Sequence, residues 1–282
     1  MNSLQKLILN RIGITICLTI FISTITNAQS VSGVVMDKVT LQELKYATIG
    51  VVGKDIGTTT NEKGAFTINL VKSIDTDSIK ISYVGYKSFY ISIAALKKKA
   101  ANGKLFLAYL DKEDYLLQEV TILSSKPKIY KDGFGLRIPG YAECFKTDIS
   151  SELGSFYTTN KILTPNQITF KVKSCSFDSA IFSVNIYKVN SDSSLTNLMA
   201  KPVLSTIRKT SKGKEVVFLL KDCLKEKISN SYAICISLVS TAGDGKLKLP
   251  IYYGSGYWRK LCESKLERLP VKVGLSVKGY LE

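Results

Sequence analysis

The chain of 282 residues contains no histidine. Histidine is the usual acid or base near neutral pH and the commonest zinc ligand, so its absence argues against most hydrolytic and zinc-dependent sites. A cysteine nucleophile normally relies on a histidine, and no Ser-x-x-Lys motif stands in a helical pattern. We therefore predict a protein that is not an enzyme and takes no cofactor or metal. Paired carboxylates among the 23 acidic residues leave a cryptic hydrolase as a third alternative.

Cysteine is scarce, and the chain has no dense disulfide framework. One of the six cysteines, Cys17, lies in the N-terminal apolar run. The other five form an odd set in the second half of the chain: Cys144, Cys175, Cys223, Cys235 and Cys262. Free cysteine is among the most buried residue types, which favours buried thiols. One disulfide, from Cys223 or Cys235 to Cys262, is the alternative.

Long apolar runs are also scarce, and the one at Ile12 to Ile25 has the features of an export signal. Lys6 and Arg11 precede it, and Thr26-Asn27-Ala28 ends it on a small residue. The run is shorter than the roughly 20 residues that span a bilayer. We expect residues 1–28 to be a signal peptide cleaved before Gln29. The mature chain should then have no transmembrane segment and lie in the periplasm or at the outer membrane.

Short alternating segments separated by Gly and Asn turns fill residues 32–86. They are Ser32-Gly33-Val34-Val35-Met36-Asp37, Ala47-Thr48-Ile49-Gly50-Val51, Asn61-Glu62-Lys63-Gly64-Ala65-Phe66 and Ile79-Lys80-Ile81-Ser82-Tyr83-Val84-Gly85-Tyr86. This pattern is typical of a small β-sandwich. Its order resembles the carboxypeptidase regulatory-like domain, a prealbumin-like sandwich common in exported and outer-membrane proteins of Gram-negative bacteria. The resemblance implies a seven-stranded domain over 29–123. The zinc carboxypeptidases that give this domain its name use histidine and glutamate ligands, and because the chain has no histidine we expect no carboxypeptidase activity.

The rest of the chain predicts a second all-β domain. Ser124-Ser125-Lys126-Pro127-Lys128 indicates a linker, which we place at 124–140, before a sandwich over 141–282. Alternating apolar residues predict six strands there, from Gln167 to Ser174, Ala180 to Val189, Val203 to Arg208, Lys214 to Leu220, Tyr232 to Ser240 and Val271 to Tyr280. Such spacing favours a jelly-roll-like or immunoglobulin-like sandwich. The layout is loosely similar to the C-terminal sandwich that often accompanies the regulatory-like domain.

The net charge of +16 is unevenly distributed. Residues 29–123 hold 12 basic and 10 acidic residues, whereas residues 124–282 hold 25 basic and 13 acidic residues, a net +12. An exported basic domain meets little nucleic acid, so we exclude nucleic acid as a partner. We expect an anionic lipid head group, an acidic glycan or an acidic envelope protein. The alternative is a soluble, lysine-rich surface with no partner.

The segment Tyr252 to Lys260 is the best sequence candidate for a contact surface, because it holds the only tryptophan, three tyrosines and two glycines. Aromatic side chains on a glycine-rich loop can stack on sugars or anchor a protein partner. The candidate binding residues are Tyr252, Tyr253, Tyr257, Trp258 and Arg259. The alternative is that Tyr252 and Trp258 close the end of a sandwich core.

Two short acidic clusters could in principle bind calcium. They lie at Asp75 to Asp77 and Asp111 to Asp114, and neither has the spacing of a known calcium loop. We interpret both as solvated turns. The sequence thus predicts a non-enzymatic exported envelope protein, with a rigid spacer or docking domain followed by a basic interaction domain. A carbohydrate-binding module of a glycan-uptake system is the alternative.

Overall fold

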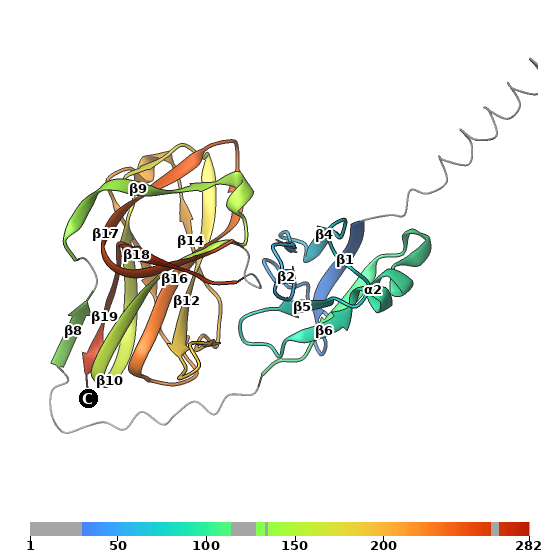
Figure 1. The fold of residues 1–282 in the computed structure, drawn as a ribbon, viewed down its shortest axis with the longest axis horizontal. Coiled ribbons are helices and arrows are strands. Elements are labelled where there is room, and N and C mark those ends of the chain that lie inside the picture. The colour runs from blue at the N-terminus through green and yellow to red at the C-terminus, as the bar shows by residue number, and fades with distance from the viewer. Residues whose placement is uncertain (1–29, 114–127, 133–134, 261–264, 282) are drawn as a thin grey trace, which may run out of the picture.

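The computed structural model describes residues 30–113, 128–132, 135–260 and 265–281. They form two all-β domains that lie side by side (Figure 1). The predicted signal peptide, Asp114 and Cys262 lie outside the described residues. Within those residues, we find no helix long and apolar enough to cross a membrane.

The N-terminal domain has the predicted seven strands. They are β1 (Ser30–Asp37), β2 (Thr48–Val51), β3 (Gly57–Thr59), β4 (Ala65–Asn69), β5 (Ser78–Ser82), β6 (Phe89–Ser92) and β7 (Phe106–Leu110). One sheet has the order β4-β1-β7 and the other β3-β2-β5-β6. The inner side chains of both sheets form one core, so the predicted sandwich is confirmed.

Local sequence explains how this domain closes. Val31, Gly33 and Val35 alternate with half-buried residues along β1. A β-carbon at Gly33 would overlap the Phe106 carbonyl of the neighbouring strand, so only glycine lets β1 and β7 approach. The turn before β4 has Gly64 at φ 65°. Its lead residue Asn61 accepts backbone N–H bonds through Oδ1 from Lys63 and Ala65, at 2.9 and 3.1 Å.

A short helix, α2 (Ile93–Lys99), joins β6 to β7. Ser92 caps it by accepting the backbone N–H of Ala95 at 3.3 Å. Three lysines in its last turn suit the negative end of the helix dipole. Ile93 and Leu96 are buried in the domain core, which fixes the helix against the open side of the sandwich. A short 3-10 helix (Ala101–Gly103) follows it.

The second domain is one continuous twelve-stranded sheet. Its strands are β8 (Lys128–Asp132), β9 (Arg137–Phe145), β10 (Glu152–Lys171), β11 (Ser174–Cys175), β12 (Ser179–Val189), β13 (Leu195–Asn197), β14 (Val203–Ile207), β15 (Glu215–Leu219), β16 (Ile228–Ala242), β17 (Lys246–Arg259), β18 (Glu267–Val273) and β19 (Leu275–Leu281). Two 3-10 helices (Lys146–Asp148 and Lys209–Ser211) lie between them.

The sheet folds back on itself because its longest strands run through both layers. The first half of β10 pairs with β16 and β17, and its second half pairs with β15 and β19, with a register shift between Thr159 and Leu163. A bulged strand that changes layers is how orthogonal sandwiches turn a corner. The enclosed core includes the large buried rings of Phe170, Phe182 and Phe218. An immunoglobulin-like sandwich has two separate sheets instead.

Three sequence predictions about this domain need correction. The predicted linker at 124–140 is wrong over 128–132 and 137–140, because β8 pairs with β19 and β9 pairs with β17. Apolar and polar residues do not alternate regularly in these edge strands, so periodicity did not reveal them. The segment Lys246–Arg259 is a strand rather than a glycine-rich loop. The predicted strand at 271–280 is divided at Gly274 into β18 and β19.

Candidate functional site

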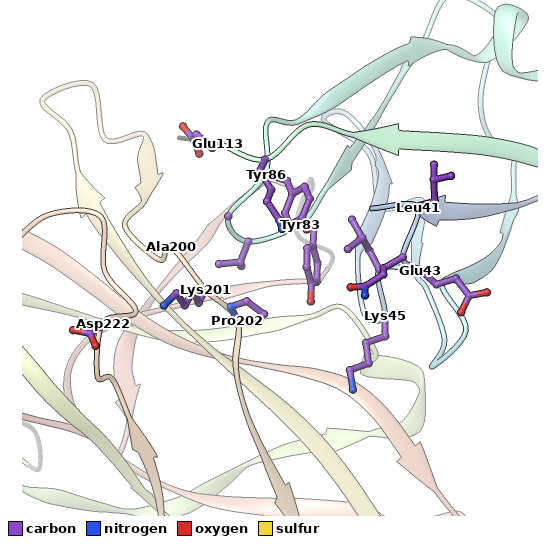
Figure 2. Close-up of a pocket in the computed structure, with 15 residues that line it drawn as sticks. Leu41, Glu43, Lys45, Tyr83, Tyr86, Glu113, Ala200, Lys201, Pro202 and Asp222 are labelled. Carbon is purple, nitrogen blue, oxygen red and sulfur yellow. The ribbon is translucent and has the colours of Figure 1, made fainter. Parts of the chain in front are cut away.

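A pocket of about 930 Å³ lies between the two domains. Figure 2 shows Tyr83 and Tyr86 on the side of the first domain, facing Ala200, Lys201 and Pro202 of the second. A second pocket, of about 390 Å³, shares Tyr83 and Tyr86 with the first and extends over the outer face of β12 and β16. We treat the two pockets as one interdomain cleft.

The loop from Tyr83 to Tyr86, which we call the tyrosine loop, forms the wall of this cleft on the first domain. Gly85 at φ 88° allows the turn that the backbone N–H of Tyr86 closes on the Tyr83 carbonyl, at 3.0 Å. The backbone N–H of Glu113 donates to the Gly85 carbonyl at 3.0 Å, which ties the loop to the chain that leaves β7. The two tyrosine rings lie 5.4 Å apart between centroids. The loop is thus held rigidly enough to define a site.

The buried carboxylate of Asp37 holds the tyrosine loop in place through a hydrogen bond to Tyr86. Asp37 accepts the backbone N–H groups of Val39 and Thr40, both at 2.8 Å, and the hydroxyl of Tyr86 at 2.7 Å. The Lys112 ammonium lies 3.4 Å from the carboxylate. The Thr40 N–H and the Tyr86 hydroxyl, with the Val39 N–H, hold the pKa of Asp37 well below its usual range despite burial. Burial and Asp37 raise the pKa of Tyr86, so its hydroxyl remains a donor.

The floor of the smaller pocket carries a buried ion pair of the second domain. Glu152 at the start of β10 is 1% exposed. It accepts hydrogen bonds from Arg259 at the end of β17, whose Nε lies 3.0 Å from Oε2 and whose Nη2 lies closer. The Tyr187 hydroxyl donates to the other carboxylate oxygen at 2.7 Å. Removal of one partner from such a pair leaves a buried charge without compensation.

Ion pairs and one apolar contact join the domains across the cleft. Lys225 lies 2.8 Å from Glu113, and Lys260 lies 3.6 Å from Asp55. In each pair the basic residue belongs to the second domain, as its excess charge favours. Exposed pairs contribute little, about 0–1 kcal/mol each. Val84 at the tip of the tyrosine loop packs against the core of the second domain, which adds a contact that salt does not screen.

Cations outnumber anions among the residues that line the smaller pocket. The basic residues are Lys45, Lys80, Lys87, Lys225 and Arg259. The acidic residues there are Glu113 and Glu152, and both already lie in ion pairs. Lys45 and Lys87 are exposed to solvent. The pocket therefore carries a net positive charge, which suits an anionic ligand.

The five sequence candidates do not form one surface. Because they lie on β17, neighbouring side chains point to opposite faces. Tyr252 and Tyr257 are buried, at 6% and 1% exposure, whereas Tyr253 is 60% exposed. Trp258 is half-buried. Arg259 alone of the five lines the cleft.

Sequence reasoning missed most of the residues that line the cleft. The sequence pattern places Tyr83 and Tyr86 in the sandwich motif, although a Tyr-Val-Gly-Tyr turn with two aromatic rings is a signal for the wall of a pocket. Glu152 stands in an alternating strand, where a lone carboxylate signals a buried partner. Its partner Arg259 is 107 residues away, and spacing cannot reveal such a pair.

The described residues offer little reactive chemistry. No three acidic or cysteine side chains among them lie close enough together to hold a metal ion. Burial raises the pKa of the Cys144 thiol to about 12, and burial also raises the pKa of Cys175 and Cys223. Thiols with raised pKa values are poor nucleophiles at neutral pH. No disulfide joins any two of the four described cysteines, and three of them are buried as expected.

The acidic clusters lie in lysine-paired turns as far as they are described. Asp77 lies 2.6 Å from Lys54, and Asp75 lies 2.8 Å from Lys97. Asp111 lies 3.0 Å from Lys38. Lysine ammonium groups thus lie where a calcium ion would have to bind these carboxylates.

Residues 31–122 match the family of CarboxypepD_reg-like domains, which confirms the resemblance for the N-terminal third of the chain. No curated protein matches the chain. Among solved structures, it is similar to a clostridial cysteine protease Cwp84 after propeptide cleavage (11% identity, 84% of this chain and 66% of that one, TM-score 0.35). A second similar structure contains the protease and lectin-like domains of Cwp84 from Clostridium difficile (12% identity, 84% and 59%, TM-score 0.34). A third is an infectious bursal disease virus structure (13% identity, 84% and 58%, TM-score 0.26).

The chain spans less than two thirds of the length of these solved chains. With TM-scores below 0.5, the similarities are too distant to establish a shared fold or a shared activity.

Proposed function

We propose that the protein is a non-catalytic docking module of the cell envelope whose interdomain cleft binds an anionic partner. The observation that carries this proposal is the cationic excess of the smaller pocket, where Lys45 and Lys87 stand exposed beside tyrosine rings. Cations in a concave site with aromatic walls attract and orient negatively charged groups. An anionic lipid head group, an acidic glycan and an acidic protein face share this chemistry.

The absence of histidine and the raised thiol pKa values support a binding role over a catalytic one. The regulatory-like domain at residues 31–122 fits a non-catalytic module. An N-terminal stretch with the charge and length of an export signal supports the envelope as the compartment. The regulatory-like domain then serves as a rigid support that presents the tyrosine loop to the basic second domain.

The test is a binding assay with residues 29–282 against anionic and neutral liposomes and against acidic and neutral glycans, at low and high salt. We expect retention on one anionic probe and its loss at high salt, because screening shortens the reach of exposed charges. The double substitution Lys45→Gln and Lys87→Gln should weaken that retention by about tenfold. Lys161→Gln with Lys278→Gln, on exposed residues that do not line the cleft, is the matched control.

Equal retention on neutral probes, retention that salt leaves unchanged, or equal effects of the two double substitutions would each overturn the proposal. The two types of anionic probe separate a lipid partner from a glycan partner within it.

A further inference from the structure

A second cationic surface lies on the basic domain, outside the cleft. It follows the outer face of β9 and the first half of β17, which are paired antiparallel with Lys246 opposite Phe145 and Lys248 opposite Glu143. We call it the β9 strip and define it by Arg137, Tyr141, Glu143, Phe145, Lys173, Lys246 and Lys248. None of these residues lines either part of the cleft. In Figure 1, β9 crosses one end of the second domain.

Alternation along the two strands directs the side chains of the strip outward and those of their neighbours in sequence into the core. Cys144 on β9 and Leu247 and Leu249 on β17 are buried in the domain core. Tyr141 and Phe145 are 37% and 42% exposed on the opposite face. A sheet with a packed inner face is a rigid support, so the outward side chains have fixed spacing.

The side chains of the strip form a continuous series of contacts. The Arg137 guanidinium lies over the Tyr141 ring, 5.4 Å from its centroid, and the Lys248 ammonium lies 5.8 Å from the same ring. Lys246 lies 5.7 Å from the centroid of the Phe145 ring. Such cation–π contacts hold flexible basic side chains in place while leaving them at the surface. The aromatic rings therefore position the cations.

Glu143 stands between the two lysines of β17 and is the only acidic residue in the strip. Its carboxylate lies 3.0 Å from the Lys248 ammonium and 3.2 Å from that of Lys246, and these two lysines lower its pKa. Four basic residues against one acidic residue leave the strip with a net charge of +3. Lys173 lies between β10 and β11, and its backbone N–H donates to the Lys248 carbonyl at 3.0 Å, which places it beside the strip. Arg137, Lys173 and Lys248 together lower the pKa of Tyr141.

We propose that the β9 strip binds a linear acidic polysaccharide, with its carboxylates on the basic side chains of the strip. Arg137 and Phe145 pair with Tyr252 and Lys246, which are six residues apart on β17, and this corresponds to about 20 Å along a strand. A linear array of fixed cations of that length matches a polymer that repeats its negative charge, whereas one lipid head group would meet only part of it. Insertion into a membrane would need exposed apolar side chains, but here the rings are partly covered by cations.

The test uses residues 29–282 and polygalacturonate, with dextran as the neutral polymer and phosphatidylglycerol vesicles as the lipid probe. Lys246→Gln with Lys248→Gln should lower the affinity for polygalacturonate by about tenfold, since each exposed charge pair contributes modestly. Glu143→Gln should raise the affinity by about threefold, because it removes the carboxylate that competes with the ligand. Lys161→Gln with Lys278→Gln is again the matched control, and thermal unfolding checks that all variants fold.

An affinity for polygalacturonate that the Lys246 and Lys248 substitutions leave unchanged would overturn the proposal. A loss of affinity in Glu143→Gln would also overturn it, since a merely structural pair predicts that direction. Stronger binding to the vesicles, lost in the same lysine variant, would assign the strip to a membrane instead. The cleft proposal fails or holds separately, because it depends on Lys45 and Lys87.

Discussion

The ring of Tyr257 on β17 lies directly over Gly154, its pairing partner on β10, in the space that a side chain at position 154 would fill. A β-carbon at Gly154 would overlap the ring carbons of Tyr257. The ring then covers Cys235 and packs 5.2 Å from the ring of Phe156, between centroids. This arrangement explains why an aromatic residue of the candidate segment is buried on the outer face of a sheet.

We expect Gly154→Ala to lower the free energy of unfolding by about 1–3 kcal/mol, because it overpacks a filled site. Urea denaturation of both proteins measures the difference. In a Tyr257→Leu background the same substitution should cost less, since the overlapping ring is gone. Equal costs in the two backgrounds would show that the ring does not cause the effect.

Tyr253 and Tyr257 should respond differently to truncation. Tyr257→Ala removes a buried ring and should lower the free energy of unfolding by about 3–5 kcal/mol. Tyr253→Ala, at an exposed position, should change it by no more than about 0.5 kcal/mol. Thermal unfolding of both variants tests this, with glycan and liposome binding as a second readout. If Tyr253→Ala is fully stable but loses binding, Tyr253 contacts the ligand. If Tyr253→Ala unfolds, the side chain is not exposed as described.

Arg259 should be essential for the stability of the second domain. Arg259→Met leaves the buried Glu152 carboxylate without its main partner and should cost about 3–5 kcal/mol. Glu152→Gln combined with Arg259→Met should recover much of that loss, because the buried charge is removed as well. Chemical denaturation of the wild type, both single variants and the double variant gives the coupling. If the loss of stability in the double variant equals the sum of the losses in the two single variants, the two side chains do not interact.

The N-terminal domain should lose stability in acid through Asp37. Hydrogen bonds from Thr40 and Tyr86 lower its pKa in the folded state, so folding is favoured above the usual aspartate pKa of about 3.9. This contribution is lost as the pH falls from about 4 toward the lowered folded value. Denaturant midpoints between pH 2 and pH 6 measure it. In Asp37→Asn the slope below pH 4 should be smaller, and an unchanged slope would assign it to other carboxylates.

Val84 should hold the two domains together. We expect Val84→Asp to separate them, because a charge cannot stay buried against the core of the second domain. Small-angle X-ray scattering should then show a larger radius of gyration, with each domain still folded. Val71→Asp, at a position of the first domain that is 52% exposed, is the control. Equal radii for wild type and Val84→Asp would mean that the Val84 contact does not hold the domains together.

The fold class followed from local patterns because each pattern depends on neighbours in the sequence. The Asn61 turn, the positive φ of Gly64 and the alternation in β1 are consequences of short-range sterics and hydrogen bonding. The sequence analysis missed the edge strands β8 and β9 because their apolar and polar residues do not alternate regularly. Their hydrogen bonds go to β19 and β17, more than a hundred residues away.

The candidate site followed from the sequence to a much smaller degree. The excess of basic residues in the second half of the chain indicated only the sign of the charge that the proposed ligand would carry. It could not show that Lys246 and Lys248 share a face with Arg137, or that Lys45 and Lys87 line one pocket. Composition predicted a contact surface at the aromatic segment 252–259. The pleating of the strand instead divides its side chains between the core and the surface.

By itself, the sequence determined two β-rich domains, the regulatory-like character of the first and the positive charge of the second. These properties depend on composition and on the two-residue period of a strand, which the chain carries locally. Only the tertiary structure decided which charges meet, because pairs such as Glu152 with Arg259 and Glu113 with Lys225 join residues more than a hundred positions apart. Their proximity depends on sheet register and domain contact, and no local pattern encodes either.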